Sequence, residues 1–326
     1  MGAPAVMVRH QSRTGEPFPV SNHLNLPFSL PGRFYRGNLH THSTRSDGRL
    51  EPEEVIGRYK EQGYDFLALT DHFMERFEYP ITDTRELRSA DFTTLLGAEL
   101  HAPAIGDGGL WHIVAVGLPL DFVPPEPDES GPELVERADK AGAWIGIAHP
   151  AWYGVTLEDA LTLHHAHAVE VHNQGHTVDS DRGNGWYLAD LLSAHGRRPL
   201  AYAADDAHFK DRPDHFGGWV QVRSESLDPD SLLTALHGGH YYSSTGPEIH
   251  DVCVEGDRIR VSCSPAQSIF AGGRGSVARY AHGDGITEAD FPLDPFLSAY
   301  MRITVLDASG KRAWTNPVWF DDIAPQ

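Results

Sequence analysis

Cysteine and long apolar runs are scarce in this 326-residue chain, and each scarcity excludes a class of protein. The 2 cysteines are Cys253 and Cys263, and a hairpin turning near Gly256 would not place them opposite each other. We therefore expect reduced thiols in a cytoplasmic protein rather than a disulfide scaffold. No apolar run approaches the length of a membrane span. Residues 1–21 lack the apolar segment of a signal peptide, and we expect an N-terminal arm over residues 1–33.

Basic residues are also few, since 26 Lys and Arg face 46 Asp and Glu and leave a net charge of −20. Such a surface repels nucleic acid, which argues against a long nucleic-acid partner. The chain also lacks a Gly-x-Ser-x-Gly motif and a phosphate-cradling glycine-rich loop, so serine-hydrolase and P-loop chemistry are disfavoured. Histidine, in contrast, is abundant at 20 residues and is the commonest metal-ligating side chain, although compositional drift would also raise its count. Two or three bound divalent ions would offset about four to six negative charges.

Apolar strand-like segments alternate with helix-like segments through the first two thirds of the chain. Strands are expected at 64–70, 92–98, 111–118, 143–148, 168–172, 200–204 and 218–222, and helices at 52–62, 133–141, 157–165 and 185–195. This alternation predicts parallel βα units, and seven or eight of them suit a (β/α) barrel. We assign the barrel to residues 34–226.

The pattern changes after Asp228. A short helix is expected at 230–237, and alternating segments predict strands at 251–254, 258–262, 300–305 and 318–320. We therefore predict a small C-terminal domain, resembling a β-sandwich, over residues 227–326.

The stretch Gly37–Leu50 contains two histidines one residue apart, His40 and His42, followed by Asp47 on a turn. Alternate side chains of a strand share a face, so the two imidazoles can hold one divalent ion. An isolated His-x-His pair is more often a coincidence than a metal site, and its meaning depends on further ligands elsewhere.

Further ligand-type side chains follow the other predicted strands. Alone, His72 could belong to a helix-capping turn, and His112 and His149 could be satisfied core histidines. Glu99 is harder to dismiss because it follows an apolar run, where an unpaired charge is costly. Strand ends of a barrel meet at one face, so we predict one metal centre there. Its candidate ligands are His40, His42, Asp47, His72, Glu99, His112, His149, Asp206 and His208.

The motifs HTHSTRSDG, LTDH, GAE, LWHIVAVG, AHP and DDAH occur in an order that resembles the polymerase and histidinol phosphatase (PHP) superfamily. The resemblance spans roughly residues 36–209, and the segments 240–249 and 311–320 resemble the CehA/McbA-like branch. It implies a distorted (β/α)7 PHP barrel that holds two or three divalent ions, Mn, Zn or Fe.

The resemblance also implies how the ligands are shared. The first ion would use His40, His42, Glu99 and Asp206. The second would share Glu99 and add His112 and His149, and the third would use Asp47, His72 and His208. The sequence Asp205-Asp206-Ala207 stands where Ser-Asp-Ala is usual, and spacing favours Asp206 over Asp205 as the ligand.

The leading hypothesis is a phosphoesterase that cleaves a small phosphate ester with a metal-bridging hydroxide beneath Glu99. Arg45 could bind a phosphate through two hydrogen bonds. His172, Asn173 and His176 lie at or just after the end of a predicted strand and could protonate a leaving group or orient a ligand, and of these we take His172 as the catalytic candidate. Each of these residues could instead be an ordinary solvated or packed side chain. Lys210, which follows His208, is a candidate of the same kind as Arg45. The alternatives are a carboxyl or carbamate ester hydrolase with the same metals, favoured by Trp111, Trp152 and Tyr153 near the ligands, or a non-catalytic metal-stabilised module. The expected partner is a small-molecule ester, and the possibility of a homo-oligomer stays open.

Overall fold

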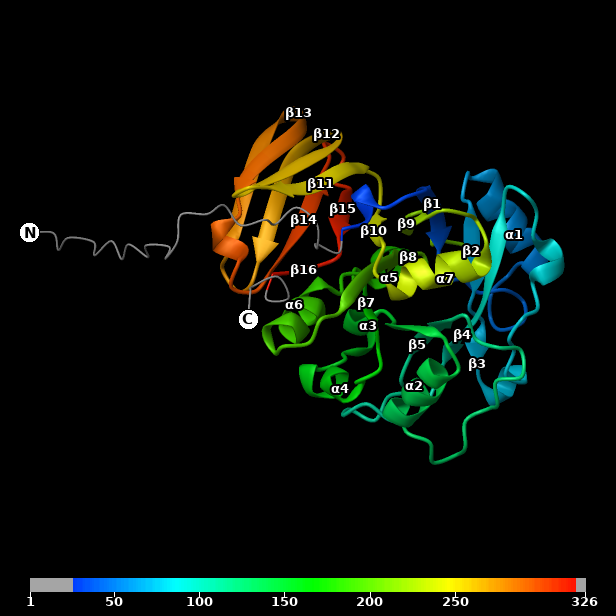
Figure 1. The fold of residues 1–326 in the computed structure, drawn as a ribbon. Coiled ribbons are helices and arrows are strands. Elements are labelled where there is room, and N and C mark those ends of the chain that lie inside the picture. The colour runs from blue at the N-terminus through cyan, green and yellow to red at the C-terminus, as the bar shows by residue number, and fades with distance from the viewer. Residues whose placement is uncertain (1–25, 321–326) are drawn as a thin grey trace, which may run out of the picture.

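The computed structural model describes residues 26–320, which form a mixed α/β protein around a central sheet (Figure 1). The predicted N-terminal arm falls mostly outside these residues. Within the described chain no helix has the length and apolar character needed to cross a bilayer. Both cysteines are free, as predicted.

The first part of the chain alternates strands with helices. Its strands are β1 (Arg33–Asn38), β2 (Phe66–Leu69), β3 (His72–Phe73), β4 (Thr93–Leu100), β5 (Ile113–Val116), β6 (Trp144–Ile147), β7 (Ala168–Asn173), β8 (Leu200–Ala204) and β9 (Trp219–Ser224). Its helices are α1 (Pro52–Glu61), α2 (Gly131–Lys140), α3 (Pro150–Tyr153), α4 (Leu157–Thr162), α5 (Gln174–Ser180), α6 (Trp186–Ala194) and α7 (Pro229–His237), with short 3₁₀ turns η1 (Pro27–Ser29), η2 (Glu75–Phe77) and η3 (Arg85–Leu87).

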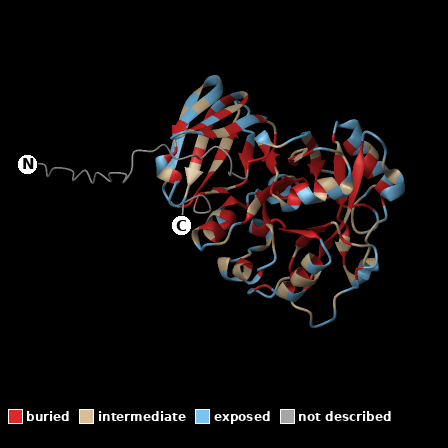
Figure 2. Ribbon diagram, in the orientation of Figure 1, coloured by how far each residue is buried: buried red, intermediate tan, exposed pale blue. Residues whose placement is uncertain are grey.

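Local signals explain these elements. Strands β2, β5 and β6 are buried at every residue, which is why they stand out as continuous apolar runs. Helix α2 begins with a capping box, in which Ser130 and Glu133 satisfy each other's free backbone donors. Figure 2 shows the result: the central strands are buried and the outer helix faces are exposed.

The strand directions correct part of the sequence prediction. Pairs β1–β2, β2–β4, β6–β7 and β7–β8 are parallel, as expected for βα units. Strand β5, however, runs antiparallel to both β4 and β6. The segment between β4 and β5 contains no helix, and a parallel neighbour would need a longer crossover connection.

The two ends of this strand series meet at one point. An isolated parallel bridge joins Thr41, just after β1, with Ala207, just after β8. The backbone of His42 donates to the carbonyl of Ala207 at 2.9 Å, and Asp206 donates to the carbonyl of His40 at 2.9 Å. This contact brings the His-x-His motif beside the Asp-x-His motif, although the two lie far apart in sequence.

The strand predicted at residues 218–222 is present, but it does not run parallel to its neighbours. These residues begin β9, which pairs antiparallel with β1 on one side and with β10 on the other. The sheet therefore continues into the C-terminal strands instead of ending there. These strands are β10 (Tyr241–Ser244), β11 (Ile249–Glu255), β12 (Arg258–Gly273), β13 (Ala278–Pro292), β14 (Tyr300–Leu306), β15 (Arg312–Thr315) and β16 (Val318–Trp319), with a 3₁₀ turn η4 (Asp294–Phe296).

The C-terminal strands have an apolar cluster of their own, which includes Ile259, Ile269 and Ile303. They gather at one end of the molecule, away from α1 and α2 (Figure 1). The predicted turn at Gly256 is present and adopts a positive φ of 61°. Because β10 pairs with both β9 and β15, the C-terminal strands continue the central sheet through backbone hydrogen bonds.

A close backbone approach in β1 gives a test of this packing. Gly37 lies opposite Phe66, and a Cβ atom there would come within 2.1–2.3 Å of the buried Phe66 ring. We expect Gly37→Ala to lower the free energy of unfolding by about 1–3 kcal/mol. The matched control is Gly57→Ala in α1, where nothing lies within 4 Å. That control should raise stability by about 0.5–1 kcal/mol. Denaturant unfolding measures the free energy of unfolding of both variants. An equal change in the two variants would contradict the close packing of Gly37 against Phe66.

Candidate metal centre

The structure brings all nine predicted ligand residues into one cluster. They come from the ends of β1, β4, β6 and β8, from the loop after β1, from β3 and from the segment before β5. Each makes a close contact with at least one other member. The set comprises His40, His42, Asp47, His72, Glu99, His112, His149, Asp206 and His208.

Four of these side chains surround one point. The Nε2 atom of His40 lies 3.6 Å from Glu99 Oε2 and 3.3 Å from Asp206 Oδ1. The Nε2 atom of His42 lies 3.5 Å and 3.0 Å from the same two oxygens. Ligands about 2.1 Å from a tetrahedral ion are separated by about 3.4 Å, so this spacing suits one divalent ion.

Unsatisfied polar atoms support the same reading. His40 Nε2 and His42 Nε2 are buried and have no hydrogen-bond partner, and Glu99 Oε2 is buried with one short contact, to His72 Nδ1 at 2.7 Å. Leaving such atoms unpaired is costly, and native structures rarely do so. A cation bound between them would satisfy all three, and a mixed nitrogen and oxygen set suits ions such as Zn, Fe and Mn.

The second oxygen of Glu99 faces a different pair of imidazoles. Its Oε1 lies 2.8 Å from His112 Nδ1 and 3.2 Å from His149 Nε2. The two oxygens of one carboxylate therefore face two groups of nitrogen donors. This is the arrangement that a carboxylate bridging two ions requires.

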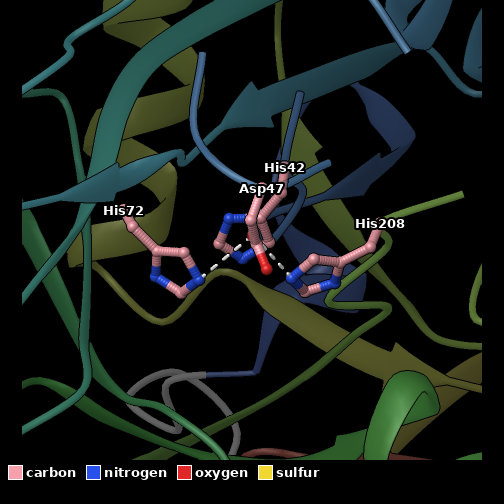
Figure 3. Close-up of side chains that lie close together, drawn as sticks. All are labelled: His42, Asp47, His72 and His208. Carbon is pink, nitrogen blue, oxygen red and sulfur yellow. Dashed lines mark ion pairs between the residues drawn. The ribbon is translucent and has the colours of Figure 1, made fainter. Parts of the chain in front are cut away.

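A third group lies at the more open end of the cluster. Asp47 Oδ1 lies 3.4 Å from His72 Nε2 and 3.1 Å from His208 Nε2. Figure 3 shows the two rings pointing at Asp47 from opposite sides, with His42 beside them. The other Asp47 oxygen pairs with Lys210 Nζ at 2.9 Å, so this lysine is occupied by a carboxylate. The expected separation of Asp47 from the His40–His42 pair is incomplete, because His42 adjoins both groups.

Glu170 contacts the cluster and was not predicted from the sequence. It is fully buried on β7, and its Oε1 lies 3.1 Å from His40 Nδ1. Its Oε2 accepts hydrogen bonds from the His149 backbone at 2.6 Å and from Asn173 Nδ2 at 3.0 Å. A carboxylate on the far nitrogen of a ligating histidine fixes the ring and its tautomer. The signal was present, since Glu170 is a lone acid inside an apolar strand, as Glu99 is.

Asp71 positions the loop between two of the predicted ligands. Asp71 accepts hydrogen bonds from the Ser43 backbone, the Ser43 hydroxyl and the Ser46 hydroxyl, each at 2.7 Å, and so fixes the loop between His42 and Asp47. Its position directly before His72 was a signal that went unused.

The geometry also distinguishes Asp205 from Asp206. Asp205 accepts from the backbone amides of residues 216–218 at 2.8 Å and from the Tyr59 hydroxyl at 2.7 Å. Its carboxylate therefore holds a loop, whereas Asp206 faces His40 and His42, as the spacing predicted.

Two more histidines that were not among the predicted metal ligands join the cluster. His101 Nε2 lies 2.9 Å from His72 Nδ1 and its ring also lies near Glu99, while its Nδ1 contacts the Trp111 carbonyl at 3.0 Å. His176 Nε2 lies 3.3 Å from Asp206 Oδ2. His101 was not singled out from the sequence, and His176 was considered with His172 only as a group that could protonate or orient a substrate.

The predicted catalytic histidine lies elsewhere. His172 Nε2 contacts Gln174 Oε1 at 3.3 Å and its ring stacks near Trp314, so the structure does not bring it into the cluster. The register of β7 shifts between Glu170 and His172, and it is Glu170 that faces the ligands. Arg45 is exposed on the loop between His42 and Asp47.

The three aromatic candidates separate into one core residue and two neighbours of the cluster. Trp111 is buried in the apolar core. Trp152 is 38% exposed and stands edge-on to His112 and His149. Tyr153 donates from its hydroxyl to the His112 carbonyl at 3.3 Å. Of the three, Trp152 is the one that reaches solvent beside the ligands.

Burial and charge act in opposite directions on the ionisable groups. Burial alone would raise the pKa of Glu99 and of Asp206, but the neighbouring imidazoles hold both well below their usual values. Burial would lower the pKa of His72, yet the charge of Glu99 raises it to about 10. His42 behaves oppositely, since burial and the adjacent His208 lower its pKa to about 3. The carboxylates therefore stay charged, ready to hold cations.

Comparison with known proteins agrees with this site. Residues 38–157 match the family model of the PHP domain, which contains seven of the nine predicted ligands. An uncharacterised protein of Methanocaldococcus jannaschii is 31% identical over 116 residues, which is 35% of this chain. The match spans 45% of that relative's length.

Two solved structures are similar in part to this chain. A two-domain protein of Bacteroides vulgatus, described as containing a predicted PHP-like metal-dependent phosphoesterase, is 14% identical, covers 86% of this chain and 94% of its own, and has a TM-score of 0.49. A putative metal-dependent phosphoesterase of Bifidobacterium adolescentis is also 14% identical, covers 62% of this chain and 96% of its own, and has a TM-score of 0.41. These identities are too low to transfer an activity.

The charge balance predicts that metal binding releases protons. The pKa of His40 and that of His208 are raised, although burial opposes this, because carboxylates face them, and the pKa of His72 is raised to about 10. At neutral pH the ring of His72 therefore carries a proton that an arriving ion must displace, and the raised pKa values of His40 and His208 act in the same direction. The affinity for Zn²⁺ should therefore rise as the pH rises from neutral toward 10. Calorimetry in buffers of different ionisation enthalpy measures the protons released, and a value of zero would contradict these protonation states.

Proposed function

We propose that this chain is a PHP-type metal-dependent hydrolase that acts on a small ester. The observation that carries the proposal is Glu99, a fully buried carboxylate whose two oxygens face two separate groups of histidine nitrogens. Unpaired buried atoms converge on the first of these groups. The PHP domain match over residues 38–157 supports the same family.

We assign three ion positions to the cluster. The first is held by His40, His42, Glu99 and Asp206. The second shares Glu99 and adds His112 and His149. The third is held by Asp47, His72 and His208. Mn, Zn and Fe are the candidate ions, since the donors are imidazoles and carboxylates without thiolate.

The chemistry follows from two adjacent ions. When bound, divalent ions lower the pKa of a water molecule and offset negative charge on the attacked ester. The chain then needs no nucleophile of its own. Glu99 and Asp206 hold the ions together, while Glu170 and Asp71 keep the ligand-bearing segments in place.

A phosphate ester is the substrate class we favour. Arg45 is exposed on the ligand loop, and a guanidinium there can bind phosphate through two hydrogen bonds. The same ions would also hydrolyse a carboxyl or carbamate ester. The exposed Trp152 beside His112 and His149 favours that second reaction, because it offers an apolar contact for an uncharged substrate.

The remaining assignments complete the proposal. We propose that residues 34–226 form a distorted (β/α)7 barrel and that residues 227–326 form a C-terminal β domain. The Thr41–Ala207 bridge between the two ends of the strand series supports the barrel. We also propose the CehA/McbA-like branch, a cytoplasmic location and a small-molecule ester as partner.

Removing the bridging carboxylate tests the proposal. We expect Glu99→Gln to lower kcat/KM on the order of 100-fold or more, because both ions lose a charged ligand. The control is Glu61→Gln at the exposed end of α1, which should keep full activity. A phosphomonoester, a phosphodiester and a carboxyl ester, each assayed with Mn²⁺, Zn²⁺ and Fe²⁺, would identify the reaction. Full activity of Glu99→Gln would exclude this mechanism.

The third ion position can be tested separately. Asp47→Ala should reduce the metal content by one ion per chain and leave the others, because the other eight proposed ligands remain. Asp211→Ala is the control, since Asp211 is an exposed aspartate of a neighbouring ion pair with Arg49. Elemental analysis after dialysis measures both variants. Loss of every ion from Asp47→Ala would show that the positions are not independent.

A further inference from the structure

Asp206, like Glu99, divides its two oxygens between different neighbours. Its Oδ1 faces His40 and His42 at 3.3 Å and 3.0 Å. Its Oδ2 lies 3.3 Å from His176 Nε2 and 4.0 Å from His149 Nε2. The residues that face Oδ2 therefore include His149, which we assign to the second ion, and His176, which has no assigned role.

These distances suit a shared cation. Donors about 2.1 Å from one ion lie about 3.0 Å apart at right angles and about 4.2 Å apart when opposite. The two contacts of Asp206 Oδ2 fall within this range. One ligand atom from each of His149, His176 and Asp206 also lies within 4.8 Å of the other two.

The surroundings hold His176 in this place. Its ring stacks on Trp152, with centroids 4.4 Å apart and planes 15° apart, and meets His149 edge to face. Asn173 accepts a hydrogen bond from the His176 backbone at 2.8 Å and donates from Nδ2 to Asp206 Oδ2 at 3.2 Å. A single asparagine thus fixes both the start of α5 and the carboxylate that His176 faces.

The second ring nitrogen of His176 makes no hydrogen bond. Its Nδ1 is buried without a hydrogen-bond partner, so no acceptor fixes the ring from behind. The stack on Trp152 and the cap by Asn173 therefore place the ring, which leaves Nε2 directed at Asp206.

We propose that His176 is a tenth metal ligand, which completes the second ion position together with Asp206 Oδ2. That ion would then be held by Glu99, His112, His149, His176 and Asp206, and both carboxylates would bridge it to the first ion. Three imidazoles and two carboxylates favour Zn²⁺ or Fe²⁺ over Mg²⁺ or Ca²⁺. The inference rests on the proposed function, since it extends the same metal centre.

The test removes the nitrogen and keeps the aromatic stack. His176→Phe can still pack on Trp152 but has no donor atom. We expect it to lose one Zn²⁺ per chain after dialysis, or to bind one Zn²⁺ on the order of 100-fold more weakly, while the other ions keep their affinities. His237→Gln is the matched control, because His237 lies at the end of α7 and contacts the Gly142 carbonyl instead of a cluster residue. It should bind Zn²⁺ as the unaltered protein does.

A second variant distinguishes the loss of a metal ligand from a folding defect. His176→Asp restores an oxygen donor, so it should regain part of the lost Zn²⁺ affinity, whereas a purely packing role would make it worse than Phe. Circular dichroism and thermal unfolding check the fold of each variant. Unchanged affinity for every ion in His176→Phe would overturn the inference and leave the proposed function intact. Fewer than two ions in the unaltered protein would instead overturn the proposed function.

Discussion

The carboxylate of Glu99 is the constraint on which the rest of the site depends. It is fully buried at the end of β4, where an isolated charge would be prohibitively costly. Imidazoles from β1, β3, β6 and the segment before β5 surround it, and they hold its pKa well below the usual value although burial opposes this. Protonated rings or cations must balance this charge. The imidazoles that do so, or that bind such cations, lie at strand ends, so these strand ends have to lie close to Glu99.

A network of buried, hydrogen-bonded side chains fixes these strand ends relative to one another. Glu170 connects His40 on one side with the His149 backbone on the other, and Asn173 connects Glu170 with Asp206. These contacts tie together the ends of β1, β6, β7 and β8. Strand ends and buried hydrogen bonds therefore position this part of the cluster, as a preorganised metal centre requires.

Much of the candidate site could be predicted because its ligands follow apolar runs. Strand ends of a barrel meet at one face, so the candidate ligands could be assigned to one cluster from their positions. The pairing of Glu99 with Asp206 came only from the resemblance to the PHP superfamily. The antiparallel direction of β5 could not be predicted, because strand pairing leaves no trace in a short apolar run. Strand β13 was not predicted, because it is mostly exposed and its buried and exposed residues do not alternate. His101 was missed and His176 was not placed among the metal ligands, because their proximity to the ligands arises only from tertiary packing.

The central claim is that Glu99 lies between two metal ions. Crystals grown with Mn²⁺ and measured for anomalous scattering would locate each ion directly. The account predicts peaks on both sides of the Glu99 carboxylate, each about 2.0–2.2 Å from a different oxygen, and about 3.5–4 Å from each other. A single peak, or peaks that do not contact Glu99, would contradict it.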